Sequence, residues 1–294
     1  MNARVSTQPQ PSNSSVDAGG MTDIGRARDT NEDAFLIATL QRSLQVHQAS
    51  PGAQGWFRGE PAGTLLIVAD GMGGQGGGDI ASRTAIETVT NYLLNAMPWV
   101  SVQPSHAQRD SRPTTSSMGL RHELSKAILA GDEGVRAEGA HVATPRMGTT
   151  LTLALVLPPH VYVAHVGDTR CYLLEAGQLQ LLTTDHNLAQ KYVEASPHPV
   201  EPPAQLQNVL WNALGGCVDE PVPQLVKRRL SPGAVLLLCS DGLTKHVSDE
   251  EIRRVLGTRS SAASRAAQLV ELANSAGGTD NITAVVTEVG GAGA

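Results

Sequence analysis

The sequence predicts an α+β domain, and three observations carry this prediction. Two short apolar runs, residues 64–69 and 235–239, each lead toward an Asp-Gly pair and have the length of buried strands. Residues 148–183 contain several short apolar runs separated by turns, which predicts an antiparallel meander. In residues 79–96, apolar side chains recur every fourth position, so this segment should form a helix that packs on the sheet.

The remaining N-terminal segments follow from local composition. Residues 33–38 read as a short strand, and residues 41–63, with two prolines and several glycines, as a loop or extended hairpin. Residues 98–117 are rich in Ser, Pro and Thr and predict a mobile loop. A second helix is expected over residues 120–138.

Toward the C-terminus, prolines interrupt residues 187–216, which predicts an irregular flap. Ser248 and Glu251 form a capping-box pattern that opens a short helix. Another helix is expected over residues 260–276. It should end there because two glycines follow. Residues 282–289 should close the chain as a strand.

Length and composition favour one catalytic domain. The chain has 294 residues, of which 40% are hydrophobic and 17% charged, so it can bury a sizeable core. Residues 1–20 are rich in Ser, Gln, Asn and Pro and lack the apolar segment of a signal peptide. We therefore expect a disordered tail over residues 1–20, a domain over residues 21–290 and a short tail over residues 291–294.

Charge and cysteine usage exclude several classes of function. The net charge of −6, without a dense Lys/Arg run, argues against a nucleic-acid partner. No apolar stretch is long enough to span a bilayer. Cys171, Cys217 and Cys239 are far apart and lack metal-binding or redox spacing. Two of them lie in apolar runs, so buried free thiols and a reducing compartment are expected. These features predict a cytoplasmic protein, which we expect to be monomeric.

The acidic residues carry the functional information. Glu32-Asp33, Asp70-Gly71, Asp241-Gly242 and Asp280-Asn281 lie at the ends of four predicted strands. A single Asp-Gly pair is more often a plain turn than a site. Four such pairs at strand ends are harder to explain as independent turns. Clustered carboxylates repel one another and are costly to bury, so their convergence implies a cation.

The ligand chemistry favours Mg²⁺ or Mn²⁺. Oxygen ligands without His or Cys select these hard cations over zinc. In a two-metal site, a water held between the ions becomes a nucleophile suited to in-line attack on phosphorus. Gly71 has no side chain, so its carbonyl could approach such an ion closely.

Ordered motifs along the chain resemble the bacterial type 2C, metal-dependent (PPM) protein serine/threonine phosphatase family. The resemblance covers residues 22–289. Its motifs are Gly25-Arg-Ala-Arg-Asp-Thr-Asn-Glu-Asp33, Val68-Ala-Asp-Gly-Met-Gly-Gly74, Gly78-Asp-Ile-Ala-Ser82, Met147-Gly-Thr-Thr150, His165-Val-Gly-Asp-Thr-Arg170, Thr184-Asp-His186, Ala213-Leu-Gly215, Ser240-Asp-Gly-Leu-Thr244 and Thr279-Asp-Asn281.

The resemblance implies an α-β-β-α sandwich, with two central antiparallel sheets flanked by helix pairs. It also implies hydrolysis of phosphoserine and phosphothreonine by a water bridging two Mn²⁺ or Mg²⁺ ions. Asp33, Asp70 and the Gly71 carbonyl should hold one ion, and Asp70, Asp241 and Asp280 the other. Phosphorylated proteins, made by a cognate bacterial Ser/Thr kinase, would be the substrates.

Further roles are implied by the same resemblance. Glu32 would act on the metals through water, and Asn281 would support Asp280. Arg28 falls where the family binds phosphate, although it could also be an ordinary surface arginine. Asp168 falls where bacterial members bind a third, weaker metal. Alternatively, Asp168 turns the chain and pairs with Arg170.

Departures from the family pattern leave some points open. Met72 stands where many animal members have a proton-donating histidine, and a metal-associated water could replace that histidine. His186 and His246 are expected to be structural or solvated. Trp211-Asn212, in the flap, replaces a polar-basic pair, so substrate choice is expected to depend on the flap. A phosphopeptide-binding pseudophosphatase and a phosphoesterase acting on small molecules remain the alternative functions.

Overall fold

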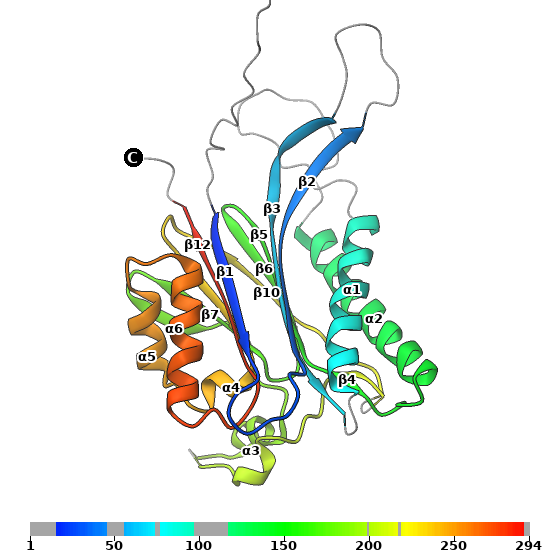
Figure 1. The fold of residues 1–294 in the computed structure, drawn as a ribbon, viewed down its shortest axis with the longest axis vertical. Helices are drawn as coiled ribbons and strands as arrows, with labels where there is room; N and C mark the ends of the chain where they lie inside the picture. Colours follow the sequence, from blue (N-terminus) through cyan, green and yellow to red (C-terminus); the bar gives the residue numbers. More distant parts are fainter. Residues whose placement is uncertain are drawn as a thin grey trace, which may run out of the picture.

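Two antiparallel sheets lie face to face between two layers of helices (Figure 1). The computed structural model describes residues 16–45, 56–73, 77–96, 117–198, 200–216 and 219–290. This arrangement confirms the predicted α+β class and the α-β-β-α sandwich. None of the helices in these ranges is long and apolar enough to span a membrane.

The first sheet has five strands within the described residues. Their order across the sheet is β1 (Val16–Asp23), β12 (Ile282–Val289), β11 (Val235–Cys239), β7 (Arg170–Glu175) and β8 (Gln178–Leu181). All neighbouring pairs are antiparallel. The sheet therefore joins the two ends of the described chain, since β1 and β12 pair along their whole length.

The second sheet has seven strands in the described part of the chain. Its path runs through β10 (Gln224–Arg229), β6 (His160–Val166), β5 (Leu151–Leu157), β3 (Trp56–Met72), β4 (Gly148–Thr149) and β9 (Leu214–Gly215), and β2 (Asp33–Gln45) pairs with β3. The β2–β3 pair extends beyond the rest of the sandwich (Figure 1). The region predicted as a loop or extended hairpin is therefore an extended hairpin, of which residues 46–55 lie outside the described chain.

Helices cover the outer face of each sheet (Figure 1). On the second sheet lie α1 (Gly78–Ala96) and α2 (Ser117–His141), and on the first lie α5 (Asp249–Leu256) and α6 (Ala262–Ser275). At the end of the sandwich are α3 (Leu188–Ala195), the 3₁₀ turn η1 (Ala204–Leu206) and α4 (Asp241–Thr244). The predicted capping box is present at α5, where Ser248 and Glu251 cap each other.

Burial on both faces explains the continuous apolar strands. In β3, Leu65 and Ile67 contribute to the core beneath α1 and α2, whereas Leu66 and Val68 contribute to the core between the sheets. Leu237 of β11 likewise belongs to the core under α5 and α6. Successive side chains of a strand point to opposite faces, so a strand between two packed layers needs apolar residues at every position.

The predicted N-terminal boundary is wrong. The structure begins a strand at Val16, whereas residues 1–20 were expected to form a disordered tail. Two glycines of this strand are required by packing: a Cβ on Gly19 would collide with Ala263 of α6, and one on Gly20 would press on the Phe35 ring. β1 is stabilised by backbone hydrogen bonds to β12, and its own sequence has no strand-forming pattern from which this pairing could be predicted.

The flap is also more regular than predicted. Within residues 187–216, α3 forms because the Asn187 side chain accepts a hydrogen bond from the Gln190 amide at 2.9 Å.

Strand β10, with its polar sequence, was not predicted at all. The predictions for residues 1–15, most of the 98–117 loop, the 291–294 tail and Cys217 lie outside the described chain.

Candidate metal centre

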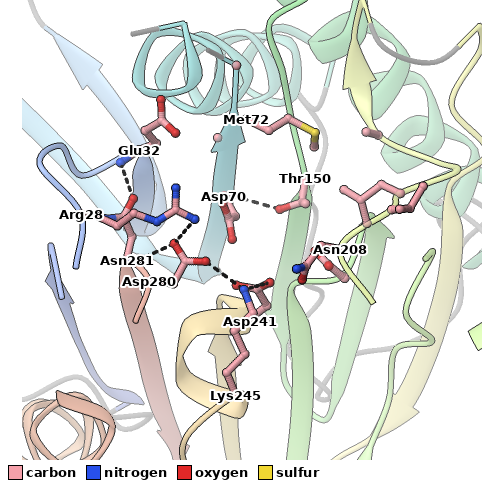
Figure 2. Close-up of a pocket in the computed structure, with 16 residues that line it drawn as sticks. Arg28, Glu32, Asp70, Met72, Thr150, Asn208, Asp241, Lys245, Asp280 and Asn281 are labelled. Carbon is pink, nitrogen blue, oxygen red and sulfur yellow. Dashed lines mark hydrogen bonds and ion pairs between the residues drawn. The ribbon is translucent and has the colours of Figure 1, made fainter. Parts of the chain in front are cut away.

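The four predicted aspartates meet at one end of the sandwich. Asp33 opens β2 and Asp70 lies near the end of β3, where the two are direct cross-strand partners. Asp241 follows β11 and starts α4, and Asp280 precedes β12. A cleft of about 550 Å³ opens there, and Asp70, Asp241 and Asp280 line it (Figure 2). Asp33 does not line the cleft and is buried beside Asp70, with 8% of its surface exposed.

Asp33 is held by one of its two carboxylate oxygens. The hydroxyls of Ser240 and Thr283 each donate a hydrogen bond to its Oδ2 at 2.7 Å. Its Oδ1 is buried and has no hydrogen-bond partner among the described residues. Burial raises the pKa of Asp33 to about 7, although the two hydroxyls act in the opposite direction. The group is therefore pre-oriented but lacks a counter-charge.

Asp70 is fixed through its backbone. Its amide donates to the Thr150 hydroxyl at 3.0 Å, and its carbonyl accepts from the Thr150 amide and the Thr149 hydroxyl, both at 2.9 Å. These contacts give the Met147-Gly-Thr-Thr150 motif a physical role. Burial, followed by the charges of Asp33 and Asp241, raises the pKa of Asp70 well above its ordinary value.

Two basic side chains contact Asp241 and Asp280 (Figure 2). Lys245 Nζ lies 2.6 Å from Asp241 Oδ2 and 2.8 Å from Asp280 Oδ2, while Arg28 Nη2 lies 2.8 Å from Asp280 Oδ1. Burial raises the pKa of Asp280, but Lys245 and Arg28 outweigh it and hold that pKa below its ordinary value. Burial raises the pKa of Asp241 despite Lys245, and within the described ranges the buried Oδ1 of Asp241 has no hydrogen-bond partner.

The side chains of Glu32 and Asn281 bond to backbone groups of neighbouring segments and not to the aspartate carboxylates. The Glu32 carboxylate accepts a hydrogen bond from the Gly78 amide at the start of α1. The Asn281 side chain accepts from the Glu32 amide at 2.8 Å and donates to the carbonyls of Ile24 and Thr30. Its backbone amide also donates to Asp280 Oδ1 at 2.9 Å. Asn281 thus supports the loop before Asp33, and it supports Asp280 through the main chain.

Asp168 lies in the turn between β6 and β7 and is largely buried. Burial, then the charges of Asp241 and Asp185, raises its pKa to about 8. The suggested pairing with Arg170 is wrong, because Arg170 makes two hydrogen bonds to Asp185, at 2.9 and 2.7 Å. A second cavity of about 300 Å³ adjoins the cleft, and Asp168, Asp241 and Lys245 line both.

Gly71 is required by the close approach of neighbouring chain segments. A Cβ at this position would collide with the Gly78 carbonyl and press on the Glu32 carbonyl. The Gly71 amide also donates to the Glu32 carbonyl at 3.1 Å. Met72 follows and lines the cleft. Residues 74–76, between β3 and α1, lie outside the described residues.

The hydrogen bonds of His186 and His246 go to the backbone and side chains of neighbouring loops and not to the aspartates. His186 Nδ1 accepts hydrogen bonds from the Gly167 amide at 3.1 Å and from the Asn212 side chain at 2.9 Å. His246 Nε2 accepts from the Thr279 amide at 3.0 Å. Trp211 packs on His186, with ring centroids 4.9 Å apart. These residues hold the flap and the loop before Asp280, as expected for structural histidines.

The comparisons with known proteins agree with this geometry. The family model described as Protein phosphatase 2C matches residues 53–280, which is most of the chain. The chain belongs to the protein phosphatase 2C family. The predicted family and enzyme class are therefore confirmed.

Other members of the family share most of this chain. The serine/threonine phosphatase stp of Listeria monocytogenes is 30% identical over 276 residues, which cover 91% of this chain and 93% of that protein. The crystal structure of Mycobacterium tuberculosis PstP/Ppp has a TM-score of 0.69 at 29% identity, covering 94% and 99% of the two chains. A structure of the PstP catalytic domain in complex with two manganese ions has a TM-score of 0.68 at 29% identity, with the same coverage.

The centre of this phosphatase 2C contains oxygen donors suited to divalent cations, but their side chains are not yet arranged around a common ion position. Within the described ranges, no three Asp, Glu, His or Cys side chains are arranged to hold an ion as they stand. Five aspartates nevertheless approach one another, with unpartnered buried oxygens on Asp33 and Asp241. Lys245 and Arg28 neutralise only part of this charge. The carboxylates outnumber the basic side chains around them, and carboxylate oxygens are hard donors that suit Mg²⁺ or Mn²⁺.

Sequence reasoning missed three residues of this centre. Ser240 and Thr283 bind Asp33, and Lys245 bridges Asp241 and Asp280. Ser240 and Lys245 could have been suspected, because one precedes Asp241 and the other follows it by one helical turn. The sequence gives no comparable signal for Thr283, since only strand pairing brings it beside Ser240.

Proposed function

We propose that this protein dephosphorylates phosphoserine and phosphothreonine in proteins with two Mn²⁺ or Mg²⁺ ions. The observation that carries the proposal is the convergence of Asp33, Asp70, Asp241 and Asp280 beside one open cleft, with more carboxylates than cations around it. A solved relative of the same family contains two manganese ions, which supports the proposal.

The ligand assignment follows the placement of the donors. We assign Asp33, Asp70 and the Gly71 carbonyl to one ion, and Asp70, Asp241 and Asp280 to the other. The free Oδ1 atoms of Asp33 and Asp241 are the kind of buried, unpartnered donors that such ions require. When bound, a pair of divalent ions lowers the pKa of water and offsets the charge of a phosphoryl group.

The chain's own residues would bind and orient the substrate. Arg28 lines the cleft with half of its side chain exposed, so its guanidinium is accessible to two phosphate oxygens. Thr150 holds the backbone of Asp70 in place during the reaction. Met72 carries no transferable proton, so the leaving serine or threonine oxygen does not receive its proton from this side chain.

Asp168 is the basis for a third, weaker cation site. It is largely buried next to Asp241, and burial with neighbouring negative charge raises its pKa. Because Asp168 and Asp241 line both cavities, an ion held there would lie at their junction. Glu32 and Asn281 would act indirectly, by fixing the segment that carries Asp33.

The cellular role follows from the substrate class. A protein phosphatase reverses a Ser/Thr kinase, so we propose a part in signal transduction with a cognate kinase. Cys171 and Cys239 are buried, free thiols on neighbouring strands, which suits a reducing, cytoplasmic compartment. We propose that the protein acts as a monomer.

The experiment is hydrolysis of an aryl phosphate and of a phosphothreonine peptide by the purified chain. We expect activity with Mn²⁺, loss of activity in EDTA, and insensitivity to okadaic-type inhibitors. Asp241→Ala should abolish turnover, whereas Glu250→Ala, an exposed acid on α5, should leave it unchanged. Activity of Asp241→Ala in EDTA would refute the metal mechanism. Turnover of the aryl phosphate alone would favour a small-molecule phosphoesterase, and peptide binding without turnover a pseudophosphatase.

A further inference from the structure

Lys245 lies between two carboxylates of the candidate metal centre. Its Nζ is 2.6 Å from Asp241 Oδ2 and 2.8 Å from Asp280 Oδ2, and about a third of its side chain is exposed (32%) (Figure 2). The lysine follows α4 directly, and its backbone amide donates to the Asp241 carbonyl at 2.9 Å. The backbone therefore fixes the base of the lysine side chain one helical turn from Asp241.

The ammonium group uses the same atoms that the second ion needs. Asp241 and Asp280 each give one oxygen to Lys245. The other oxygen of Asp280 contacts Arg28, and the other oxygen of Asp241 has no partner in the part of the chain that the structure describes. A divalent ion bound by these two carboxylates would meet a positive charge within contact distance of its own ligands. Like charges at such separation repel strongly in a partly buried site.

Lys245 also has room to leave. It lines both the cleft and the second cavity of about 300 Å³, which Asn208 and Asp185 also line. A lysine stem has four rotatable bonds, so its ammonium can turn toward the second cavity while the backbone hydrogen bond to Asp241 stays in place.

We propose that Lys245 is a tethered cation that occupies the second metal position and competes with the divalent ion for Asp241 and Asp280. This inference rests on the proposed function. In the metal-free protein Lys245 stabilises the acidic cluster, and in the metal-bound protein it opposes the ion. The lysine thus makes the second site weaker than its carboxylates alone would make it.

An ordinary ion pair and a competing cation predict different signs. Removing an ordinary ion pair lowers stability with and without metal. Removing a competing cation lowers the stability of the metal-free protein, because the aspartates lose a counter-charge, but it strengthens metal binding. Metal affinity and metal-free stability therefore change in opposite directions only if Lys245 competes.

The test is calorimetric titration of Mn²⁺ into metal-stripped protein, together with thermal melts in EDTA and in Mn²⁺. Lys245→Met keeps the length of the side chain and removes its charge, Lys245→Gln is a second neutral variant, and Lys245→Arg keeps the charge. Lys126→Met, on α2 and paired with Glu123 at 3.4 Å, changes the net charge equally, away from the cleft. Circular dichroism checks that each variant is folded.

We expect Lys245→Met and Lys245→Gln to bind the Mn²⁺ ion assigned to Asp241 and Asp280 roughly tenfold more tightly than wild type does. This is a change of about 1.4 kcal/mol in binding free energy. Their melting temperature should fall in EDTA and rise more steeply with Mn²⁺. Lys245→Arg and Lys126→Met should bind Mn²⁺ like wild type. Unchanged or weaker Mn²⁺ binding by both folded neutral variants, with binding by wild type intact, overturns this proposal alone. Absence of Mn²⁺ binding in every protein overturns it together with the proposed function.

Discussion

Ser240 and Asp33 are 207 residues apart in the sequence, and the Ser240 hydroxyl donates to Asp33 Oδ2 at 2.7 Å. The same hydroxyl oxygen accepts a hydrogen bond from the Thr283 amide at 2.9 Å. Ser240 therefore ties β12 and the end of β11, in one sheet, to the start of β2 in the other. The carboxylate of Asp33 is oriented by this contact before any cation binds.

Ser240→Ala should weaken metal binding more than it weakens chemistry. The substitution removes one of the two hydroxyls that orient Asp33 and leaves the buried Thr283 amide without its acceptor. Loss of a group that orients a metal ligand typically costs ~10–100-fold in metal affinity. Activity measured against Mn²⁺ concentration should show this shift in half-saturation. Ser275→Ala, an exposed serine on α6, is the control, and an unchanged Mn²⁺ requirement in Ser240→Ala would contradict the prediction.

Arg28→Ala should raise KM for a phosphopeptide more than it lowers kcat. A hydrogen bond to a charged group contributes about 1.5–3 kcal/mol, which corresponds to roughly 10–100-fold in kcat/KM. Arg28 also contacts Asp280, so Mn²⁺ affinity should be measured in parallel. Arg26→Ala is the matched control in the same loop. If KM stays at the wild-type value, Arg28 does not bind phosphate.

The metal-free protein should lose stability as the pH rises from about 6.5 to about 8.5. The folded-state pKa values of Asp33, about 7, and Asp168, about 8, lie above the ordinary value of 3.8. The folded protein thus keeps protons that the unfolded chain has already released, so the stability due to them falls from about pH 4 upward and is gone once the pH exceeds these folded-state values. Burial lowers the pKa of His165 to about 3 and of His186 to about 4, so both are neutral in this window.

The measurement is urea unfolding in EDTA at several pH values across that window. Asp168→Asn should flatten the pH dependence, because the amide cannot titrate. Saturating Mn²⁺ should remove or reverse the slope, since metal ligands bind as deprotonated groups. A free energy of unfolding that does not fall with pH in EDTA would show that these aspartates are already ionised in the folded, metal-free protein.

His186→Ala should destabilise the fold through the flap. The substitution leaves the Gly167 amide and the Asn212 side chain without their shared acceptor, and a buried unsatisfied group costs about 1–3 kcal/mol. Urea unfolding should therefore show a lower free energy of unfolding. His160→Ala, at the start of β6 and only half-buried, is the control. Equal effects of the two substitutions would mean that the His186 contacts do not anchor the flap.

The fold could be predicted where local pattern and tertiary role coincide. The apolar run of β3 and the four-residue spacing in α1 appear directly in the sequence, because both elements pack against a core. β1 could not be predicted, since Gly19 and Gly20 suit their packing partners rather than a strand in isolation. The polar strand β10 was missed for a similar reason: among the described strands it lies at the end of its sheet and pairs with β6 alone.

The candidate site divides in the same way. Its aspartates stand out in the sequence, because each lies at the end of a recognisable strand and four such placements are unusual. Their partners do not stand out: Thr283 is an ordinary strand residue until β12 lies beside the end of β11. The suggested Asp168–Arg170 pair was wrong because side chains choose partners in space, and Asp185 offers Arg170 two oxygens.

The sequence by itself determined the fold class, the family and the acidic residues that form the centre. These depend on residue type and spacing, which the chain carries locally. Only the tertiary structure decided which oxygens of the aspartates are already occupied, with Asp33 held by hydroxyls and Asp241 and Asp280 bridged by Lys245. Hydrogen bonds and charge interactions depend on distances of a few ångströms between segments far apart in the chain, and folding alone sets those distances.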